Sequence, residues 1–436
     1  MKEGSSGKVA FYTLGCKLNF AETATIARQF AERGYEQVGF GEKADVYIIN
    51  SCTVTAQADK KCRTAIRRAI RQAPGAFVAV AGCYAQLQAE EIKKIRGVDA
   101  ILGTQEKFRL FDLYSSFDKQ EEPEVLVSPS KKAEAFEPAY STSGRTRSFL
   151  KIQDGCDYFC SYCTIPFARG RSRSGTIAGT VERAREIAAS GIREIVLTGV
   201  NIGEFGRKQD ETFLELLREL DKVEGIDRYR ISSIEPNLID DDIIDFVAGS
   251  SKFLPHFHIP LQSGSDKILK LMQRKYNTSL FAGRVDRIRK VMPLAGIGTD
   301  VIVGFPGETD EDFEETYRFL SSLDLSYLHV FSFSSRKNTR AAAFSGMVDP
   351  TVIEQRSNRL HLLSERKRIG FAARNTGRRA DVLFESKEKD GMISGWTENY
   401  LKVVIPFREA LIGEIREVKL ATADSEGVIS AVIPGH

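Results

Sequence analysis

The stretch GCDYFCSYCTIPFARG, residues 155–170, follows a short apolar run at residues 149–152 that predicts a β-strand. Its three cysteines have the spacing CxxxCxxC: Cys156, Cys160 and Cys163. Three thiolates on one loop can ligate three irons of a 4Fe–4S cube and leave the fourth iron open. A structural zinc site would need a fourth protein ligand, for which His258 is the candidate. We predict the cluster with an open iron and keep zinc as the alternative.

The strand before this loop is the first of six that alternate with helical stretches over residues 146–370. The predicted strands occupy residues 149–152, 195–198, 229–232, 256–260, 299–303 and 327–333. Six β/α units in succession predict a partial (β/α)6 barrel of the TIM type, in which chemistry lies at the carboxyl ends of the strands. The cysteine loop lies at that end of the first strand.

Two further domains are predicted on either side of the barrel. Residues 7–115 alternate buried strands with amphipathic helices, which predicts a parallel α/β domain of the flavodoxin or Rossmann kind. Residues 116–145 are rich in serine, proline and charge and predict a linker. Residues 371–436 hold short alternating strands at the spacing of a small all-β barrel.

Three more cysteines each follow a predicted strand of the first domain: Cys16, Cys52 and Cys83. The carboxyl ends of parallel strands meet at one edge of a sheet, so we expect these thiols to converge there. Converging thiols again make a site with three ligands and one open iron; the alternative is three unrelated, half-buried cysteines. Cys62 lies on the apolar stripe of the helix predicted at residues 58–72, so we expect it to pack in the core.

Composition narrows the class of protein. The 436 residues carry 62 basic and 59 acidic side chains, a net charge of +3, so no global field indicates nucleic acid. Hydrophobic residues make up 42% of the chain, which excludes a disordered protein. No apolar run approaches the roughly 18 residues of a membrane-spanning helix, so we expect no membrane association. Seven cysteines without a predicted export signal indicate metal or redox chemistry in a reducing cytoplasm.

These residues resemble a known family. The sequence CDYFCSYCTIPFARGRSRS is similar to the cluster loop of radical S-adenosylmethionine (SAM) enzymes, with Tyr162 beside the third cysteine. Together with YTLGCKLN, NSCTVT and AGCYAQ, it resembles the radical SAM methylthiotransferases. The tail GWTENYLKVVIP resembles a TRAM domain, a small RNA-binding β-barrel. Further matches are VLTGVNIG (196–203), ISSIEPN (231–237), HIPLQSGSDKILKLMQRKY (258–276) and TDVIVGFPGET (299–309).

The resemblance implies a chemistry for each cysteine set. In the family, SAM chelates the open iron of the CxxxCxxC cluster, and one-electron reduction cleaves it to a radical that abstracts hydrogen from the substrate carbon. The other cluster would carry the sulfur, which a second SAM methylates before transfer. The implied cofactors are therefore two 4Fe–4S clusters and SAM, together with an external one-electron donor. The six cysteines are the implied catalytic and metal-binding residues: Cys16, Cys52, Cys83, Cys156, Cys160 and Cys163.

Within the family, YTLGCKLN and the segment SSRKNTRAA (334–342) are most similar to members that act on N6-threonylcarbamoyladenosine in tRNA. This implies methylthiolation of C2 of that nucleoside at position 37, with the anticodon stem-loop as partner. Asn338 stands where glycine is expected, and asparagine also tolerates left-handed geometry. The alternatives are methylthiolation of isopentenyladenosine-37 or of a ribosomal-protein aspartate, or a non-catalytic iron–sulfur RNA-binding protein. We expect a monomer.

The resemblance also implies a SAM pocket at the carboxyl ends of the barrel strands. Because both clusters must face one cavity, we expect the carboxyl edge of the first domain to cap the mouth of the barrel. An ordinary strand-to-helix turn explains the candidate glycines equally well. The candidate SAM-binding residues are Tyr162, Gly199, Asn201, Ser232, Glu235, Gln262, Gly304 and Pro306.

Three basic segments are candidate RNA contacts. They lie on the helix at residues 60–71, on the cysteine loop, and on a predicted helix and turn at residues 354–379. Charge runs are usually solvated faces, but three near a cavity mouth fit phosphate neutralisation. In the C-terminal barrel, which is about neutral, RNA binding would need aromatic contacts from Trp396 and Tyr400, although Trp396 fits the core equally well. The candidate cations are Lys60, Arg63, Arg67, Arg71, Arg169, Arg171, Arg173, Arg366, Lys367 and Arg368.

Overall fold

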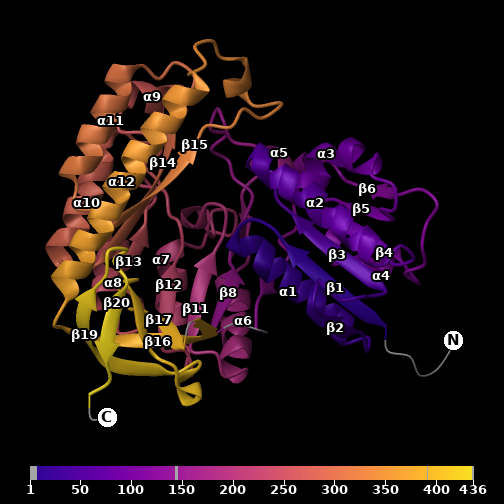
Figure 1. Ribbon diagram of the computed structural model, residues 1–436, viewed down its shortest axis with the longest axis horizontal. Helices are drawn as coiled ribbons and strands as arrows, with labels where there is room; N and C mark the ends of the chain where they lie inside the picture. The colour runs from indigo at the N-terminus through magenta and orange to yellow at the C-terminus, as the bar shows by residue number, and fades with distance from the viewer. Residues whose placement is uncertain (1–6, 143–145, 390, 435–436) are drawn as a thin grey trace.

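The computed structural model describes residues 7–142, 146–389 and 391–434, which form three domains (Figure 1). The first domain is built on a six-stranded sheet in the order β2-β1-β3-β4-β5-β6, and every neighbouring pair is parallel. The predicted parallel α/β domain is confirmed. Its elements are β1 (Lys8–Thr13), α1 (Lys17–Ala31), β2 (Glu36–Val38), β3 (Val46–Ser51), α2 (Ala56–Gln72), β4 (Phe77–Gly82), α3 (Cys83–Lys93), β5 (Ala100–Leu102), α4 (Leu110–Leu113) and β6 (Glu124–Leu126).

The central strands of this sheet show why the sequence forms it. β3 (VYIINS) and β4 (FVAVAG) are buried along their whole length, as expected for parallel strands with helices on both faces. The side chain of Thr55 caps α2 by accepting a hydrogen bond from the backbone N–H of Ala58, which begins the helix directly after β3 and its loop. Cys62 is fully buried in the core beneath α2, so its predicted packing role is confirmed.

The segment at residues 116–145 takes part in both neighbouring sheets. β6 pairs in parallel with β5 and extends the sheet of the first domain. β7 (Ala139–Tyr140) pairs antiparallel with the first strand of the barrel. The sequence predicted only a linker here, because two- and three-residue strands among serine and proline leave no periodic pattern.

The second domain is a partial barrel of six parallel strands in two hydrogen-bonded groups, β12-β11-β8 and β13-β14-β15. Single parallel bridges, such as Ser233 with His258, connect the groups. The predicted barrel is confirmed. Its strands are β8 (Arg147–Lys151), β11 (Glu194–Thr198), β12 (Arg228–Ile231), β13 (His256–His258), β14 (Gly296–Val303) and β15 (Tyr327–Ser332), and the short β9 (Gln153–Asp154) and β10 (Arg173–Ser174) form a separate ribbon.

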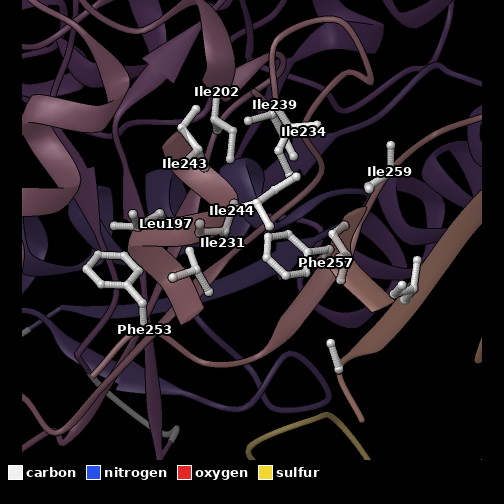
Figure 2. Packing of buried hydrophobic residues seen from close by; sticks show 14 of the residues in the cluster. Leu197, Ile202, Ile231, Ile234, Ile239, Ile243, Ile244, Phe253, Phe257 and Ile259 are labelled. Atoms are coloured by element: carbon white, nitrogen blue, oxygen red, sulfur yellow. The ribbon is translucent and has the colours of Figure 1, made fainter. Parts of the chain in front are cut away.

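Helices cover the outside of this barrel, and an apolar core lies between them and the strands. Figure 2 shows side chains from β11, β12 and β13 meeting Ile243 and Ile244 of one covering helix. In the described part of the chain no helix is long and apolar enough to cross a membrane. The helices are α5 (Ile165–Arg169), α6 (Ile177–Ala189), α7 (Phe213–Asp221), α8 (Asp241–Gly249), α9 (Asp266–Leu271), α10 (Thr278–Val291), α11 (Asp310–Ser322) and α12 (Pro350–Asn375).

The third domain is a closed five-stranded barrel in the order β16-β17-β18-β20-β19. It packs against the amino ends of the (β/α) strands, where Arg230 donates to the backbone carbonyls of Thr397 and Glu398. Asn399 donates to the carbonyl of Leu294 at 2.9 Å. The fold matches the predicted small β-barrel. Its strands are β16 (Arg379–Lys389), β17 (Met392–Thr397), β18 (Lys402–Pro406), β19 (Ile415–Ala423) and β20 (Ile429–Val432).

Candidate active site

The first three cysteines converge at one edge of the first sheet. Cys16 follows β1, Cys52 follows β3 and Cys83 begins α3 directly after β4, and these three strands are neighbours. Gly15 brings two of the loops into contact: a Cβ added to it would lie 2.8 Å from the Cys52 sulfur, and its φ of +101° also favours glycine. We call Cys16, Cys52 and Cys83 the N-terminal cysteine set.

The other three cysteines lie on the loop between β9 and α5, at the carboxyl end of β8. We call Cys156, Cys160 and Cys163 the barrel cysteine set. The backbone N–H of Tyr158 donates to the Cys156 sulfur at 3.4 Å, and the Arg274 guanidinium donates to the Cys160 sulfur at 3.0 Å. Hydrogen bonds of this kind stabilise ligated thiolates and tune the cluster they hold.

Burial keeps five of these six thiols protonated unless a metal binds them: Cys52, Cys83, Cys156, Cys160 and Cys163. It raises the pKa of Cys52 and of Cys163 to about 12, and it also raises the pKa values of Cys83, Cys156 and Cys160. Sets of buried thiols that cannot ionise unaided fit metal ligation, because a bound metal stabilises the thiolate directly.

The sulfur atoms of neither cysteine set lie close enough together in this structure to share a single ion. In the described residues, one group of three side chains brings metal-binding atoms within 4.8 Å of one another: His258, Asp300 and His329. Neither cysteine set does so, whereas thiolates around one zinc ion, each about 2.3 Å from it, lie closer than that. Each thiolate of a 4Fe–4S site binds a different iron. His258 pairs with Asp300 at 2.9 Å, so the alternative zinc site is not supported.

The segment 334–342 connects the two cysteine sets. Arg336 donates to Thr53, next to Cys52, at 2.7 Å. The backbone N–H of Ala341 donates to the carbonyl of Ser161, next to Cys160, at 2.8 Å. In addition α3, which begins at Cys83, packs against α5, which follows the barrel set. The carboxyl edge of the first domain therefore covers the barrel at its cysteine loop, as predicted.

A polar cluster lies beside the barrel cysteine set. Arg274 forms an ion pair with Glu235 while it contacts Cys160, and its guanidinium lies 3.5 Å from the Tyr162 hydroxyl. Burial raises the pKa of Tyr162 well above its usual value, so this hydroxyl stays neutral. The structure thus brings the predicted Tyr162 and Glu235 together. The sequence argument did not single out Arg274, although it lies within the quoted stretch 258–276.

Asn201 and Gln262 have the features of ligand-binding residues. Asn201 is only 2% exposed, and neither its amide nitrogen nor its carbonyl oxygen has a hydrogen-bond partner among the residues that the structure describes. A buried amide without partners costs stability, which a bound polar ligand would recover. Gln262 has a φ of +71°, a strained conformation that non-glycine residues adopt mainly at functional sites.

Packing explains the candidate glycines of the SAM pocket. A Cβ on Gly199 would lie 2.9 Å from the Gln153 side chain, and one on Gly304 would lie 2.4 Å from Ile353 of α12. Pro306 is buried in the turn after β14, which Glu308 closes by accepting from the backbone N–H of Gly304. Ser232 is buried and lines a cavity inside the barrel.

This cavity has a volume of about 240 Å³ and is lined by residues of all six barrel strands, together with Lys17 and Tyr400. Lys17 directly follows Cys16. Water reaches its ammonium group through the cavity, but the side chain lies deep between the domains, and this burial together with Arg147 and Arg230 lowers its pKa to about 8. The sequence argument did not single out Lys17 either.

Comparisons with known proteins bear on this geometry. Residues 150–320 match the radical SAM superfamily, and residues 8–103 match a family described as uncharacterized protein family UPF0004. The chain is 44% identical over 425 residues to the threonylcarbamoyladenosine tRNA methylthiotransferase MtaB of Bacillus subtilis, covering 95% of this chain and 94% of the relative. The chain belongs to the radical SAM methylthiotransferases. Membership implies an enzyme that transfers a methylthio group and uses a 4Fe–4S cluster and SAM.

Other similar proteins are consistent with this membership. The chain is 32% identical to the tRNA-2-methylthio-N(6)-dimethylallyladenosine synthase of Methylacidiphilum infernorum, over 94% of this chain and 91% of that protein. The radical SAM methyltransferase TsrM of Kitasatospora setae superposes with a TM-score of 0.54 at 14% identity, over 89% of this chain and 81% of that structure. This second likeness shows the fold alone.

Two arginines of the methylthiotransferase that we expected to contact RNA are buried instead. Arg169 donates to Glu22, Asp154 and Asn19 at 2.7–3.0 Å, and its side chain is 1% exposed. Arg173 donates to Asp154 at 3.1 Å and is also buried. Their prediction as RNA contacts is wrong, because carboxylates distant in sequence hold both guanidinium groups inside the protein.

Most of the other cations that we predicted as RNA contacts are exposed, but two of them already donate hydrogen bonds within the methylthiotransferase. Lys60, Arg67, Arg71, Arg171, Arg366 and Arg368 are exposed. Arg63 is half-buried and donates to the Tyr84 hydroxyl. Lys367 donates to the carbonyl of Leu323 at 2.7 Å, and burial lowers its pKa to about 8, so it is not a free surface cation.

The two aromatic residues proposed for RNA contact join the domains of the methylthiotransferase. Trp396 and Tyr400 stack with ring centroids 4.4 Å apart, and Tyr400 also stacks on His256 of β13 at 4.4 Å. Arg228 of β12 donates to the carbonyl of Trp396. Both residues therefore stabilise the junction between the (β/α) barrel and the TRAM barrel, and their contact with RNA stays a prediction.

Proposed function

We propose that this enzyme methylthiolates C2 of N6-threonylcarbamoyladenosine at position 37 of tRNA and gives the 2-methylthio derivative. The observation that carries the proposal is the position of the two cysteine sets, which lie on loops that the segment 334–342 joins by hydrogen bonds. The 44% identity to a relative named for this nucleoside supports the choice of substrate. The relative named for dimethylallyladenosine is only 32% identical.

The proposal includes two 4Fe–4S clusters, one for each cysteine set. When bound, the barrel cluster and SAM supply the one-electron chemistry that removes hydrogen from an unactivated carbon, which no side-chain acid or base can do. The protein places the groups: Arg274 orients the Cys160 thiolate and Glu235, and Asn201 offers an unpaired buried amide to SAM.

Nucleoside mass spectrometry tests the substrate. Reconstituted enzyme is incubated without oxygen with reductant, sulfide, SAM and anticodon stem-loops that carry either threonylcarbamoyladenosine or isopentenyladenosine. We expect the first nucleoside alone to gain the mass of a methylthio group in place of hydrogen. A gain on the second nucleoside alone would overturn the substrate. A gain on neither, with 5′-deoxyadenosine still formed, would indicate a protein substrate, and no SAM cleavage at all would indicate a non-catalytic RNA-binding protein.

We further propose that the exposed cations of α2 bind the tRNA backbone. Replacing Lys60, Arg67 and Arg71 together with alanine should raise the tRNA dissociation constant and lower the slope of log K against log salt by about 2, because each phosphate contact contributes roughly 0.7–0.9. Filter binding over a series of salt concentrations measures both quantities. The matched control is Lys222→Ala at the end of α7 in the barrel domain, whose side chain is 69% exposed. Equal binding by the triple variant and the control would remove α2 from the interface.

A further inference from the structure

The cavity inside the barrel is distinct from the polar cluster beside the barrel cysteine set. Its lining comes from β8, β11, β12, β13, β14 and β15, and Tyr400 of the TRAM barrel also lines it. Cys160, Tyr162, Glu235 and Arg274 are not among the lining residues. The cavity is therefore distinct from this polar cluster, although Ser232, a candidate SAM-binding residue, lines it, and Lys17 places it next to Cys16 of the N-terminal cysteine set.

The charges of this lining are unbalanced. Lys17, Arg147 and Arg230 line the cavity with one carboxylate, Asp300. That carboxylate already accepts hydrogen bonds from His258 at 2.9 Å and from His329 at 3.3 Å, and these bonds lower its pKa although burial would raise it. Both histidines bond to Oδ1 of Asp300, and among the described residues Asp300 forms no ion pair within 4.0 Å with Lys17, Arg147 or Arg230.

The two arginines have partners of their own. Arg147 pairs with Glu385 at 2.6 Å, and Arg230 pairs with Glu194 at 3.2 Å. Lys17 differs from both, since among the residues that the structure describes no carboxylate lies within 4.0 Å of its ammonium group. A cation that lines a cavity and lacks an ion-pair partner is free to form a charge-assisted hydrogen bond with an anionic ligand.

The chemistry of the substrate supplies that charge. The threonylcarbamoyl group on N6 of adenine ends in a carboxylate, and C6, which carries N6, is separated from C2 by N1 alone. With C2 at the N-terminal cysteine set, the N6 substituent can therefore extend toward Lys17, which directly follows Cys16. A water molecule takes roughly 30 Å³ of liquid, so a cavity of about 240 Å³ has room for this group of about ten non-hydrogen atoms.

We propose that Lys17 binds the terminal carboxylate of the threonylcarbamoyl group and thereby selects adenosines whose N6 substituent carries an anion. This inference rests on the proposed function and extends it to a specificity-determining residue. An apolar dimethylallyl group in the same cavity would leave the ammonium group without water and without a partner, and a site built for a polar group strongly disfavours an analogue that lacks it.

The test compares Lys17→Met with the wild-type enzyme on stem-loops carrying threonylcarbamoyladenosine or its methyl ester, which has no charge. For the wild type, we expect esterification to lower kcat/KM for methylthiolation by about 10- to 100-fold, the range of a hydrogen bond to a charged group. Lys17→Met should show the same loss on the free acid and no further loss on the ester, because the two changes remove one interaction. Lys17→Arg should recover part of the activity on the free acid.

Two measurements separate this role from damage to the neighbouring cluster. Iron content and SAM cleavage in the absence of tRNA should equal those of wild type and of the control Lys222→Met. The inference is overturned if Lys17→Met loses activity equally on the acid and the ester, or if esterification leaves the wild type unaffected. A wild-type enzyme that modifies only isopentenyladenosine would instead overturn the proposed function, before any variant is compared.

Discussion

Replacing all three residues of the barrel cysteine set with alanine abolishes SAM cleavage and methylthio transfer together, while the same change in the N-terminal cysteine set abolishes only the transfer. This is the expected result if each set holds its own cluster and if SAM is cleaved at the barrel set. Bound iron should fall from about eight to about four per chain in either triple variant. Iron analysis, 5′-deoxyadenosine chromatography and nucleoside mass spectrometry measure the three properties.

The matched control for these variants is Cys62→Ala, since Cys62 is fully buried in the core and belongs to neither set. It should keep all of its iron and both activities, although the smaller side chain costs some stability. A wild-type protein that binds only about four irons, or an N-terminal variant that loses SAM cleavage as well, would contradict the assignment of two independent clusters.

The second large effect concerns Glu22, the centre of a buried ion cluster between the first domain and the barrel. Its carboxylate pairs with Lys107 at 2.5 Å, with Lys151 at 3.0 Å and with Arg169 at 2.9 Å. Glu22→Gln leaves these cations without sufficient negative charge, so it should lower the free energy of unfolding by about 3–5 kcal/mol. Chemical denaturation followed by circular dichroism measures the loss, and Glu36→Gln, at an exposed residue, should change it by less than about 0.5 kcal/mol.

The same cluster predicts a dependence on pH. Burial alone would raise the pKa of Glu22, but Arg169, Lys107 and Lys151 outweigh it and hold the pKa far below the ordinary value of 4.5. The folded state therefore binds the Glu22 proton more weakly than the unfolded state, and the stabilisation is present above about pH 4.5 and is lost as the pH falls below it. Denaturation midpoints of the wild type and Glu22→Gln should converge in that acid range, and parallel curves would contradict this account.

The sequence predicted the elements with strong local signals. The strands β3 and β4, the six barrel strands and both cysteine sets follow from apolar runs, β/α alternation and loop positions. The core role of Cys62 follows from helical periodicity. In each case the information lies within one element, so a single sequence is sufficient.

The residues that the sequence misplaced depend on partners far along the chain. Arg169 was expected on the surface because its neighbours are basic, yet Glu22, 147 residues away, holds it inside. The stack of Tyr400 on His256 was not predicted either. Arg274 and Lys17 were not singled out, because a single cation beside a motif acquires meaning only when the fold shows which thiol or cavity it faces. The strands β6 and β7 were missed because they are too short to leave a pattern.

The junction between the TRAM barrel and the (β/α) barrel holds the two barrels in a fixed arrangement. A Cβ on Gly296 would lie 2.2 Å from the carbonyl oxygen of Asn399, so the two backbones are almost in contact, and Asn399 also donates to Leu294. A swing of the TRAM barrel would break these hydrogen bonds and the Tyr400 stack together. The two barrels therefore behave as one rigid unit, and the distance between their outer surfaces is fixed before any substrate binds.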